Sequence, residues 1–318
     1  MKLLVTGGAG FIGSNFVQYM LEKHPDYHIV NLDALTYAAS LDNLKEVRNN
    51  PGHRFVEGRI EDGELVDRLV QGIDVVVNFA AESHVDRSIL EPQVFIKTNV
   101  MGTQVLLDAA LRHKVKLFYQ ISTDEVYGAL PLDSKDRFTE ESQLRPNSPY
   151  SASKTAADLL VWAYYRTFDL PVVISRCSNN YGPRQHPEKF IPTVILNALH
   201  DRPVPIYGDG LYVRDWIHVL DHCRAIDLVI HKGKAGEFYN VGADNELANI
   251  DLARMILRIM GKPESLLTSV KDRPGHDRRY AIESAKIRQS LGWAPGKDFQ
   301  SQLTATIDWY KAHAAAGL

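Results

Sequence analysis

Cysteine is scarce in this sequence, and an excess of positive charge is absent. The 318 residues include two cysteines, Cys177 and Cys223, which stand among apolar or small residues and form no Cys-x-x-Cys pair. They are therefore predicted to be reduced thiols in the core. The formal net charge of −3 argues against nucleic acid or an anionic membrane as the main partner.

Long apolar runs are absent as well. The segment Leu3–Val5 is too short for the core of a signal peptide, and no later stretch approaches the ~18 apolar residues of a membrane span. We therefore expect a cytoplasmic protein that does not enter a membrane. Apolar residues make up 45% of the chain and charged residues 24%, a balance that indicates an ordered globular protein.

The order of the expected elements indicates the fold class. Short, continuous apolar runs alternate with longer helical patterns, which is typical of strands covered on both faces in a parallel sheet. We predict an α/β fold with a doubly wound, Rossmann-type parallel sheet and a smaller C-terminal lobe. Strands are expected at Lys2–Thr6, His28–Leu32, Arg54–Glu57, Val75–Phe79, Leu117–Ser122, Pro171–Arg176 and Glu237–Val241. The main helices are expected at Ile12–Lys23, Gly63–Gln71, Thr98–His113, Tyr150–Phe168 and Leu220–His231.

A glycine-rich segment follows the first expected strand. Gly8-x-Gly10-x-x-Gly13 has the spacing of a dinucleotide fingerprint, and Gly7-x-x-Gly10-x-x-Gly13 has the related spacing of short-chain dehydrogenases. Glycine is needed because the backbone turns sharply and approaches a pyrophosphate too closely for a Cβ. The pyrophosphate then rests on the positive N-terminus of the following helix.

An acidic residue at the end of the second strand indicates which dinucleotide binds. Asp33 lies twenty residues beyond Gly13, where a carboxylate can accept both ribose hydroxyls of NAD and repel a 2′-phosphate. NAD is therefore the expected cofactor, although the nearby Arg59 leaves NADP open.

Prolines and glycines break the alternating pattern after Arg176. We expect residues 1–182 and 213–247 to form the NAD-binding Rossmann domain, and residues 183–212 and 248–318 to form a lobe that binds the substrate. The cleft should lie at their junction, past the carboxyl ends of the strands.

Two further segments carry reactive side chains. Tyr150 and Lys154 share one face at the head of a helix, where the lysine and a positive nicotinamide would favour the phenolate. Thr123, Asp124 and Glu125 follow the fifth strand at its carboxyl end, where doubly wound sheets place their active sites. Because adjacent carboxylates repel, one should have a raised pKa, and we expect Asp124 to be the protonated member.

With these segments in order, the sequence resembles the extended short-chain dehydrogenase/reductase family, and within it the dTDP-glucose 4,6-dehydratases. The resemblance covers nearly the whole chain. The Thr-Asp-Glu triplet is the most informative segment, because related 4-epimerases keep the Tyr and Lys but lack the adjacent acids. The matching segments are Thr6–Gly13, Asp33–Ala38, Ala80–Ser88, Ser122–Gly128, Tyr150–Lys154, Ser178–Pro183, Pro187–Lys189, Tyr207–Gly210, Val213–Trp216, Asn249–Asp251 and Asp272–Tyr280.

The resemblance implies a hydro-lyase that converts dTDP-glucose to dTDP-4-keto-6-deoxyglucose and water. Tyr150, assisted by Thr123 and Lys154, would take the proton of the 4-hydroxyl while a hydride passes from C4 to NAD. Glu125 would remove the C5 proton, and Asp124 would protonate the departing 6-hydroxyl. The hydride would then return to C6, so NAD is not consumed. No metal is expected.

The resemblance also implies which residues bind the ligands. Two phosphates need charge-assisted donors, and Lys189 and Arg214 would supply them. Cofactor contacts are expected from Gly7, Gly10, Phe11, Ile12, Gly13, Asp33, Thr36, Ile60, Asp62, Ala80, Ala81, Thr98, Tyr150 and Lys154. Substrate contacts are expected from Ser83, Thr123, Asn179, Asn180, Lys189, Tyr207, Arg214, Asn249, Arg273, His276 and Tyr280.

One segment departs from the family pattern. Relatives usually have an Asp-Ile pair after the third strand, whose Asp contacts the adenine. This sequence has Arg59-Ile60 there, followed by Glu61-Asp62, and Asp62 is the expected substitute.

Other functions stay open from the sequence. Another nucleotide-hexose 4,6-dehydratase, a 4-epimerase or a decarboxylase, acting on a UDP, CDP or GDP sugar, is the nearest alternative. A non-catalytic dinucleotide sensor is a rival of another class, although such proteins typically lose the Tyr or the Lys. The resemblance further implies a homodimer through the helices Thr98–His113 and Tyr150–Phe168, with apolar surface from Leu159, Leu160, Ala163 and Tyr164, which could equally pack inward.

Overall fold

The computed structural model describes residues 1–272, 274–296 and 298–314. Its main sheet has seven strands in the order β10-β6-β5-β4-β1-β2-β3, with every neighbouring pair parallel. The strands are β1 (Lys2–Thr6), β2 (His28–Asp33), β3 (His53–Glu57), β4 (Val75–Asn78), β5 (Leu117–Thr123), β6 (Val172–Cys177) and β10 (Glu237–Val241). The strand order reverses between β1 and β4, so the predicted doubly wound fold is confirmed and a crevice is expected at that point.

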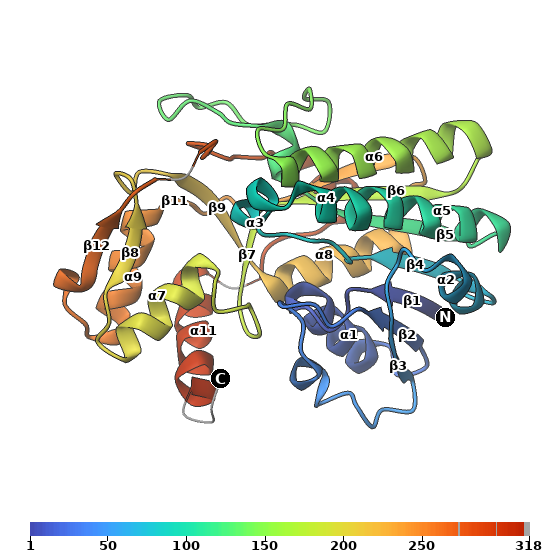
Figure 1. Ribbon diagram of the computed structural model, residues 1–318, viewed down its shortest axis with the longest axis horizontal. Helices are drawn as coiled ribbons and strands as arrows, with labels where there is room; N and C mark the ends of the chain where they lie inside the picture. The colour runs from blue at the N-terminus through green and yellow to red at the C-terminus, as the bar shows by residue number, and fades with distance from the viewer. Residues whose placement is uncertain (273, 297, 315–318) are drawn as a thin grey trace.

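Helices cover both faces of this sheet (Figure 1). One face packs against α1 (Phe11–Lys23), α8 (Val219–Lys232) and α10 (Ala285–Leu291). The other packs against α2 (Gly63–Val70), α5 (Thr103–Arg112) and α6 (Pro149–Phe168). Because apolar side chains are buried on both sides, the strands read as continuous apolar runs in the sequence.

A further hydrophobic cluster lies outside the main sheet. Strands β8 (Val204–Tyr207) and β12 (Leu267–Val270) pair in parallel there. Three helices pack around the same core: α7 (Phe190–Leu199), α9 (Asn249–Met260) and α11 (Phe299–Ala314). Figure 1 shows this group at the opposite side of the molecule from α2. The division into two domains at the expected boundaries stays a prediction.

Two local features differ from the expectation. Strand β9 (Val213–His218) pairs with β7 (Asn179–Tyr181) and β11 (Glu246–Ala248) in a separate three-stranded sheet. The helix expected at Thr98–His113 begins instead with a π-helical segment, Ile96–Gly102, before α5.

The remaining elements are short. They are α3 (Val85–Leu90), α4 (Pro92–Phe95) and the 3-10 helices η1 (Leu41–Leu44), η3 (Asp124–Tyr127) and η4 (Glu264–Leu266). Within the described residues, no helix combines the length and the apolar character needed to cross a membrane.

Candidate active site

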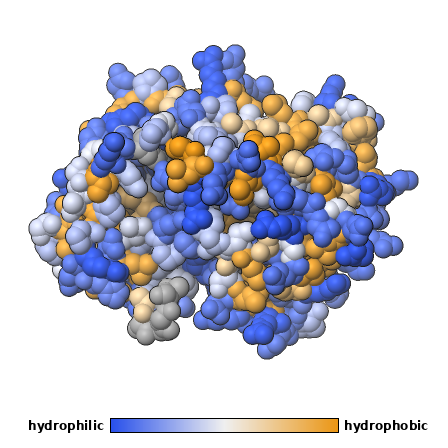
Figure 2. All heavy atoms as spheres, in the orientation of Figure 1, coloured by the Kyte–Doolittle hydropathy of each residue, from blue (hydrophilic) through white to orange (hydrophobic). Residues whose placement is uncertain are grey.

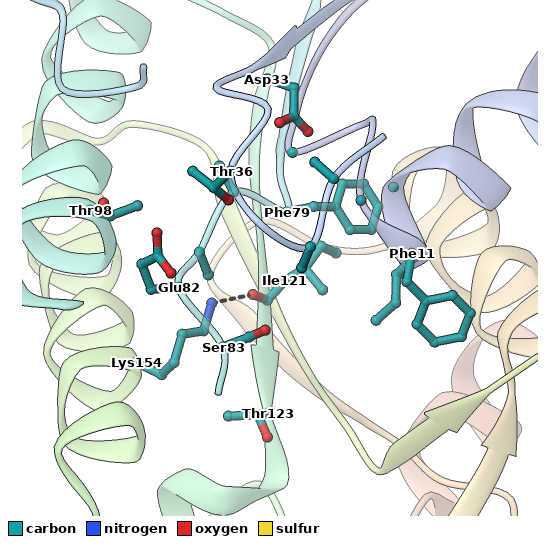
Figure 3. Close-up of a pocket in the computed structure, with 18 of the residues that line it drawn as sticks. Phe11, Asp33, Thr36, Phe79, Glu82, Ser83, Thr98, Ile121, Thr123 and Lys154 are labelled. Atoms are coloured by element: carbon teal, nitrogen blue, oxygen red, sulfur yellow. Dashed lines mark hydrogen bonds between the residues drawn. The ribbon is translucent and has the colours of Figure 1, made fainter. Parts of the chain in front are cut away.

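A cleft opens at the carboxyl ends of β1, β2, β4 and β5. Figure 3 shows Asp33 and Thr36 toward one end and Ser83 and Thr123 toward the other. Most of the expected cofactor residues line it: Gly7, Gly10, Phe11, Ile12, Gly13, Asp33, Thr36, Ile60, Ala80, Ala81, Thr98, Tyr150 and Lys154. These expected cofactor residues therefore share one cavity, although they come from six separate segments of the sequence.

The glycine loop between β1 and α1 lets a ligand approach the protein backbone closely. Gly7 has a φ of +72°, and a Cβ there would lie 2.7 Å from the backbone nitrogen of Ala80. A Cβ on Gly13 would lie 2.3 Å from the carbonyl oxygen of Gly7. Both positions therefore require glycine for steric reasons, and the helix N-terminus behind them faces the cleft.

Asp33 closes the second strand with its carboxylate held by the backbone. Oδ2 accepts from the N–H of Ala9 and Oδ1 from the N–H of Leu35, both at 2.8 Å. Burial raises the pKa of Asp33, and these backbone hydrogen bonds oppose the shift. Each carboxylate oxygen has a further lone pair, so the group can still accept from a pair of ribose hydroxyls.

The acid pair lies where β5 ends. Thr123 caps η3: its Oγ1 accepts from the N–H of Glu125 at 3.3 Å and donates to Oδ1 of Asp124 at 3.4 Å. Asp124 is 2% exposed, and among the described residues its Oδ2 has no hydrogen-bond partner. Burial, and then the nearby charge of Glu125, raise the pKa of Asp124 well above its ordinary value. This direction agrees with the expectation that Asp124 is the protonated member.

Tyr150 and Lys154 lie on the first turns of α6, which starts with a capping box at Ser148. The Nζ of Lys154 donates to the carbonyl oxygen of Ile121 at 2.7 Å (Figure 3), and burial lowers the pKa of Lys154. Burial and the charge of Glu125 raise the pKa of Tyr150. The expected bias toward the phenolate is therefore absent in this state, because the lysine ammonium is directed at a backbone carbonyl.

The substrate residues expected from the sequence fall into two groups. Ser83, Thr123, Asn179, Asn180 and Lys189 line the cleft. The Nζ of Lys189 donates to the carbonyl oxygen of Ser83 at 3.2 Å, which joins the loop after β7 to the loop after β4. A cationic side chain therefore lines the substrate side of the cleft.

The second group lies outside the lining of this cleft, on β9, at the end of β8, at the start of α9 and in the loop before α10. The guanidinium of Arg214 lies 4.2 Å from the ring centre of Tyr280. Arg214 and Tyr280 nevertheless lie near Asp124 and Glu125. The charge of Arg214 lowers the pKa of Asp124, and the charge of Glu125 raises the pKa of Tyr280.

Three more expected substrate residues belong to this second group. The edge of Tyr207 faces the ring of His276, with the ring centres 6.2 Å apart. Asn249 begins α9, and its Oδ1 is buried without a hydrogen-bond partner among the described residues. Arg273 lies outside the described residues.

Comparisons with known proteins place this cleft in a family. The model of the GDP-mannose 4,6 dehydratase family matches residues 4–306. The dTDP-glucose 4,6-dehydratase of Streptomyces antibioticus is 51% identical over 320 residues, which is 99% of this chain and 94% of that protein. This chain belongs to the nucleotide-sugar 4,6-dehydratase family.

Two further relatives are similar to this chain in sequence or in structure over nearly its whole length. The low-salt glycan biosynthesis protein Agl12 of Haloferax volcanii is 54% identical, covering 98% of each chain. DesIV, a dTDP-glucose 4,6-dehydratase from Streptomyces venezuelae solved with NAD and TDP bound, has a TM-score of 0.96 at 48% identity. That comparison covers 99% of this chain and 98% of DesIV. The resemblance inferred from the sequence is therefore confirmed.

The adenine end of the cleft differs from what the sequence led us to expect for this dehydratase. Asp62 does not line the cleft, because its Oδ1 caps α2 by accepting from the N–H of Leu65 at 3.0 Å. Glu61 lines the cleft in its place, with Oε1 accepting from Oγ1 of Thr98 at 3.0 Å and lying 4.0 Å from Nη1 of Arg59. The helix-start signal at Asp62, an acid before an amphipathic run, could have predicted this exchange.

Sequence reasoning also missed a further acid that lines the cleft. Glu82 follows β4 and lies between Thr98 and Lys154 in Figure 3. Burial raises its pKa, while the charges of Arg59 and Arg87 lower it. No spacing rule assigns a role to this residue, although it lies within the family-like segment Ala80–Ser88.

Proposed function

We propose that this protein is an NAD-dependent dehydratase that converts dTDP-glucose to dTDP-4-keto-6-deoxyglucose and water. The observation that carries the proposal is the position of a buried acid beside a second acid, Asp124 and Glu125, in the same cleft as Tyr150 and Lys154. Relatives named dTDP-glucose 4,6-dehydratases are about half identical over nearly the full length. Both lines of support point to the same reaction.

NAD fits the residues at the Asp33 end of the cleft. The glycine loop leaves space that a Cβ would fill, and the Asp33 carboxylate has lone pairs for two ribose hydroxyls. Glu61, held by Thr98, can accept from the exocyclic amine of adenine. When bound, NAD serves as the acceptor and later the donor of the sugar's hydride.

The chain's own residues move the protons. Tyr150 takes the proton of the sugar's 4-hydroxyl, and Lys154 on the same helix face would favour the phenolate once its ammonium turns from the carbonyl oxygen of Ile121 toward Tyr150. A ketone at C4 acidifies the C5 proton, which Glu125 removes as a base. The bond from C6 to its oxygen breaks as Asp124 gives that oxygen a proton, and water leaves.

The remaining expected contacts hold the nucleotide part of the substrate. We propose that Lys189 and Arg214 offset the charge of the diphosphate, with Ser83, Asn179 and Asn180 nearby. Tyr207, Asn249, His276 and Tyr280 are proposed to contact the nucleotide side, and Arg273 keeps the role expected from the sequence.

Turnover of a set of nucleotide sugars tests this function. Purified protein with NAD is given dTDP-, UDP-, CDP- and GDP-glucose in turn, and the 4-keto-6-deoxy product is measured by its carbonyl absorbance in alkali. We expect the highest kcat/KM with dTDP-glucose. A higher kcat/KM with another base would reassign the substrate, and a 4-epimer as the product would contradict dehydration.

We further propose that the protein acts in the cytoplasm as a homodimer. Large apolar side chains are exposed on adjoining elements: Ile89 and Leu90 of α3, Val94 of α4, Ile96 and Met101 of the π-helical segment, and Leu159 of α6. Figure 2 shows apolar surface over the region where Figure 1 draws α3 and α4. By contrast, Leu160 and Tyr164 pack against the core on the α6 face of the sheet.

A further inference from the structure

A fully buried histidine lies behind the substrate side of the cleft. His222 is on the first turn of α8, has no exposed surface, and takes no part in the proton transfers proposed above. Its Nδ1 lies 2.9 Å from Oδ1 of Asn180, which does line the cleft. The imidazole is therefore one residue removed from the substrate side.

The hydrogen bonds around Asn180 decide which way its amide faces. Its Nδ2 is 3.0 Å from the carbonyl oxygen of Ser178, and a carbonyl can only accept. The amide nitrogen must therefore face Ser178, which leaves Oδ1 facing His222. Because Oδ1 also only accepts, Nδ1 of His222 must carry the proton.

The surroundings of the other ring nitrogen, Nε2, agree with a neutral His222 that carries its proton on Nδ1. Among the described residues, Nε2 is buried without a hydrogen-bond partner. Burial lowers the pKa of His222 to about 3, since removing a charged ring from water is unfavourable. At neutral pH the ring is therefore neutral, with Nδ1–H as its donor and Nε2 unprotonated.

The orientation of Asn180 in turn affects other residues of the cleft wall through direct contacts. Its Nδ2 also contacts Sγ of Cys177 at 3.3 Å, and that thiol donates to the carbonyl oxygen of Ser122 at 3.4 Å. The backbone carbonyl oxygen of Asn180 accepts from Nε2 of Gln185 at 2.9 Å. The chain of contacts thus reaches the residue before Thr123 and the loop that carries Lys189.

We propose that His222 is a positioning residue for the nucleotide sugar: its Nδ1–H holds the Asn180 amide, and through it the adjoining cleft wall, in a single orientation. The inference rests on the proposed function for the identity of the ligand. It adds a requirement of its own, that the donor must sit at the Nδ1 position.

Three substitutions at one position separate positioning from simple core filling. Asparagine places its amide nitrogen near the position of Nδ1, glutamine places it near Nε2, and phenylalanine keeps the ring shape without a donor. We expect His222→Asn to keep the wild-type KM for dTDP-glucose and the wild-type affinity for dTDP. His222→Gln and His222→Phe should weaken both about tenfold, the loss of one well-placed hydrogen bond.

The controls use the same helix and the same partner. Cys223→Ala removes buried volume at the next residue of α8 and should leave the KM and the dTDP affinity unchanged. NAD affinity should be unchanged in every variant, because the glycine loop and Asp33 lie toward the other end of the cleft. In Asn180→Ala, adding His222→Phe should cause no further loss if the histidine acts through the asparagine.

The outcomes distinguish this inference from the proposed function. If affinity follows side-chain volume, so that phenylalanine or glutamine is tolerated better than asparagine, His222 is a packing residue and the inference is wrong. Nitrogen chemical shifts that place the proton on Nε2 would also overturn it. If the wild-type protein binds dTDP but does not convert dTDP-glucose, the proposed function fails, while the ranking of dTDP affinities still decides the role of His222.

Discussion

Asp124 and Glu125 are neighbours in the chain but lie in different surroundings. Asp124 is buried, whereas Glu125 is partly exposed to solvent. Loss of water around Asp124, with added repulsion from Glu125 and Asp215, raises its pKa. A protonated carboxyl can donate, so Asp124 is suited to the general acid role and Glu125 to the base role.

Replacing Asp124 should lower the activity of the protein and raise its stability. Asp124→Asn is expected to lower kcat by roughly 10²- to 10⁴-fold, because the departing 6-hydroxyl loses its proton donor. The pKa of Asp124 is higher in the folded than in the unfolded state, so the wild type loses stability as the pH rises from about 4 through the folded-state pKa. Asparagine does not titrate and removes this loss.

The measurement is denaturant unfolding of both proteins over a range of pH. At pH 8 the variant should be more stable than the wild type by at least about 1 kcal/mol, and the difference should vanish below pH 4. A variant that is less stable at pH 8, or one with full turnover, would contradict the assignment of a protonated acid.

The base has a more specific signature. Glu125→Gln should prevent removal of the C5 proton, so that the sugar no longer exchanges this hydrogen with solvent. The test is incubation with dTDP-glucose in deuterium oxide, followed by mass spectrometry and NMR of the recovered sugar. Persistent exchange at C5 in the variant would remove Glu125 from the base role. The matched control is Glu64→Gln, an exposed glutamate on α2.

At the scale of residues, the sequence predicts which residues form the site better than it predicts the contacts that their side chains make. Asp33, the acid pair, Tyr150 and Lys154 could be chosen because each follows a strand end or opens a helix. The direction of the Lys154 ammonium, toward the carbonyl of Ile121, depends on packing that no spacing reveals.

At the scale of elements, the loop between β1 and α1 is the most constrained part of the cofactor site. Gly13→Ala should abolish stable NAD binding, because the added Cβ would lie 2.3 Å from the carbonyl oxygen of Gly7. The check is the NAD content of the purified protein and its affinity by calorimetry. Gly63→Ala is the matched control, since an added Cβ there would lie 4.0 Å from Cγ1 of Val105, an ordinary contact distance. Normal NAD binding by the Gly13 variant would contradict the proposed cradle.

The strands of the main sheet were predictable and those of the smaller sheets were not. A strand buried on both faces, such as β4, leaves a continuous apolar run that can be read directly. Strands β7 and β11 are three residues long, and β9 carries Arg214 and Asp215 within its run. Their pairing depends on tertiary contacts that local patterns do not encode.

At the scale of the whole molecule, the exposed apolar residues of α3, α4 and α6 predict self-association. Leu159 is 55% exposed, so Leu159→Arg should shift a dimer toward the monomer without unfolding it. Sedimentation velocity of the wild type and the variant measures this directly. Leu41→Arg, at a similarly exposed position on η1, should leave the dimer intact. A wild-type protein that sediments as a monomer at micromolar concentration would contradict the homodimer.

The overall architecture was predictable because the glycine fingerprint and the alternation of apolar strand runs with helical patterns both indicate a doubly wound sheet. How Arg214 and Tyr280 come together near the acid pair was not, because Arg214 lies on β9 and Tyr280 lies in a loop distant in the sequence, where its N–H donates to the carbonyl oxygen of Val213. A contact between segments so far apart in the sequence cannot be read from sequence spacing.

The most direct test of the proposed dehydration follows one hydrogen. Substrate dTDP-glucose carrying deuterium at C4 is converted by the NAD-loaded protein, and the product is examined by NMR and mass spectrometry. We predict that the deuterium is found at C6 of a 4-keto-6-deoxy sugar, with solvent hydrogen at C5. A product that keeps its 6-hydroxyl, or deuterium that remains at C4, would contradict the account.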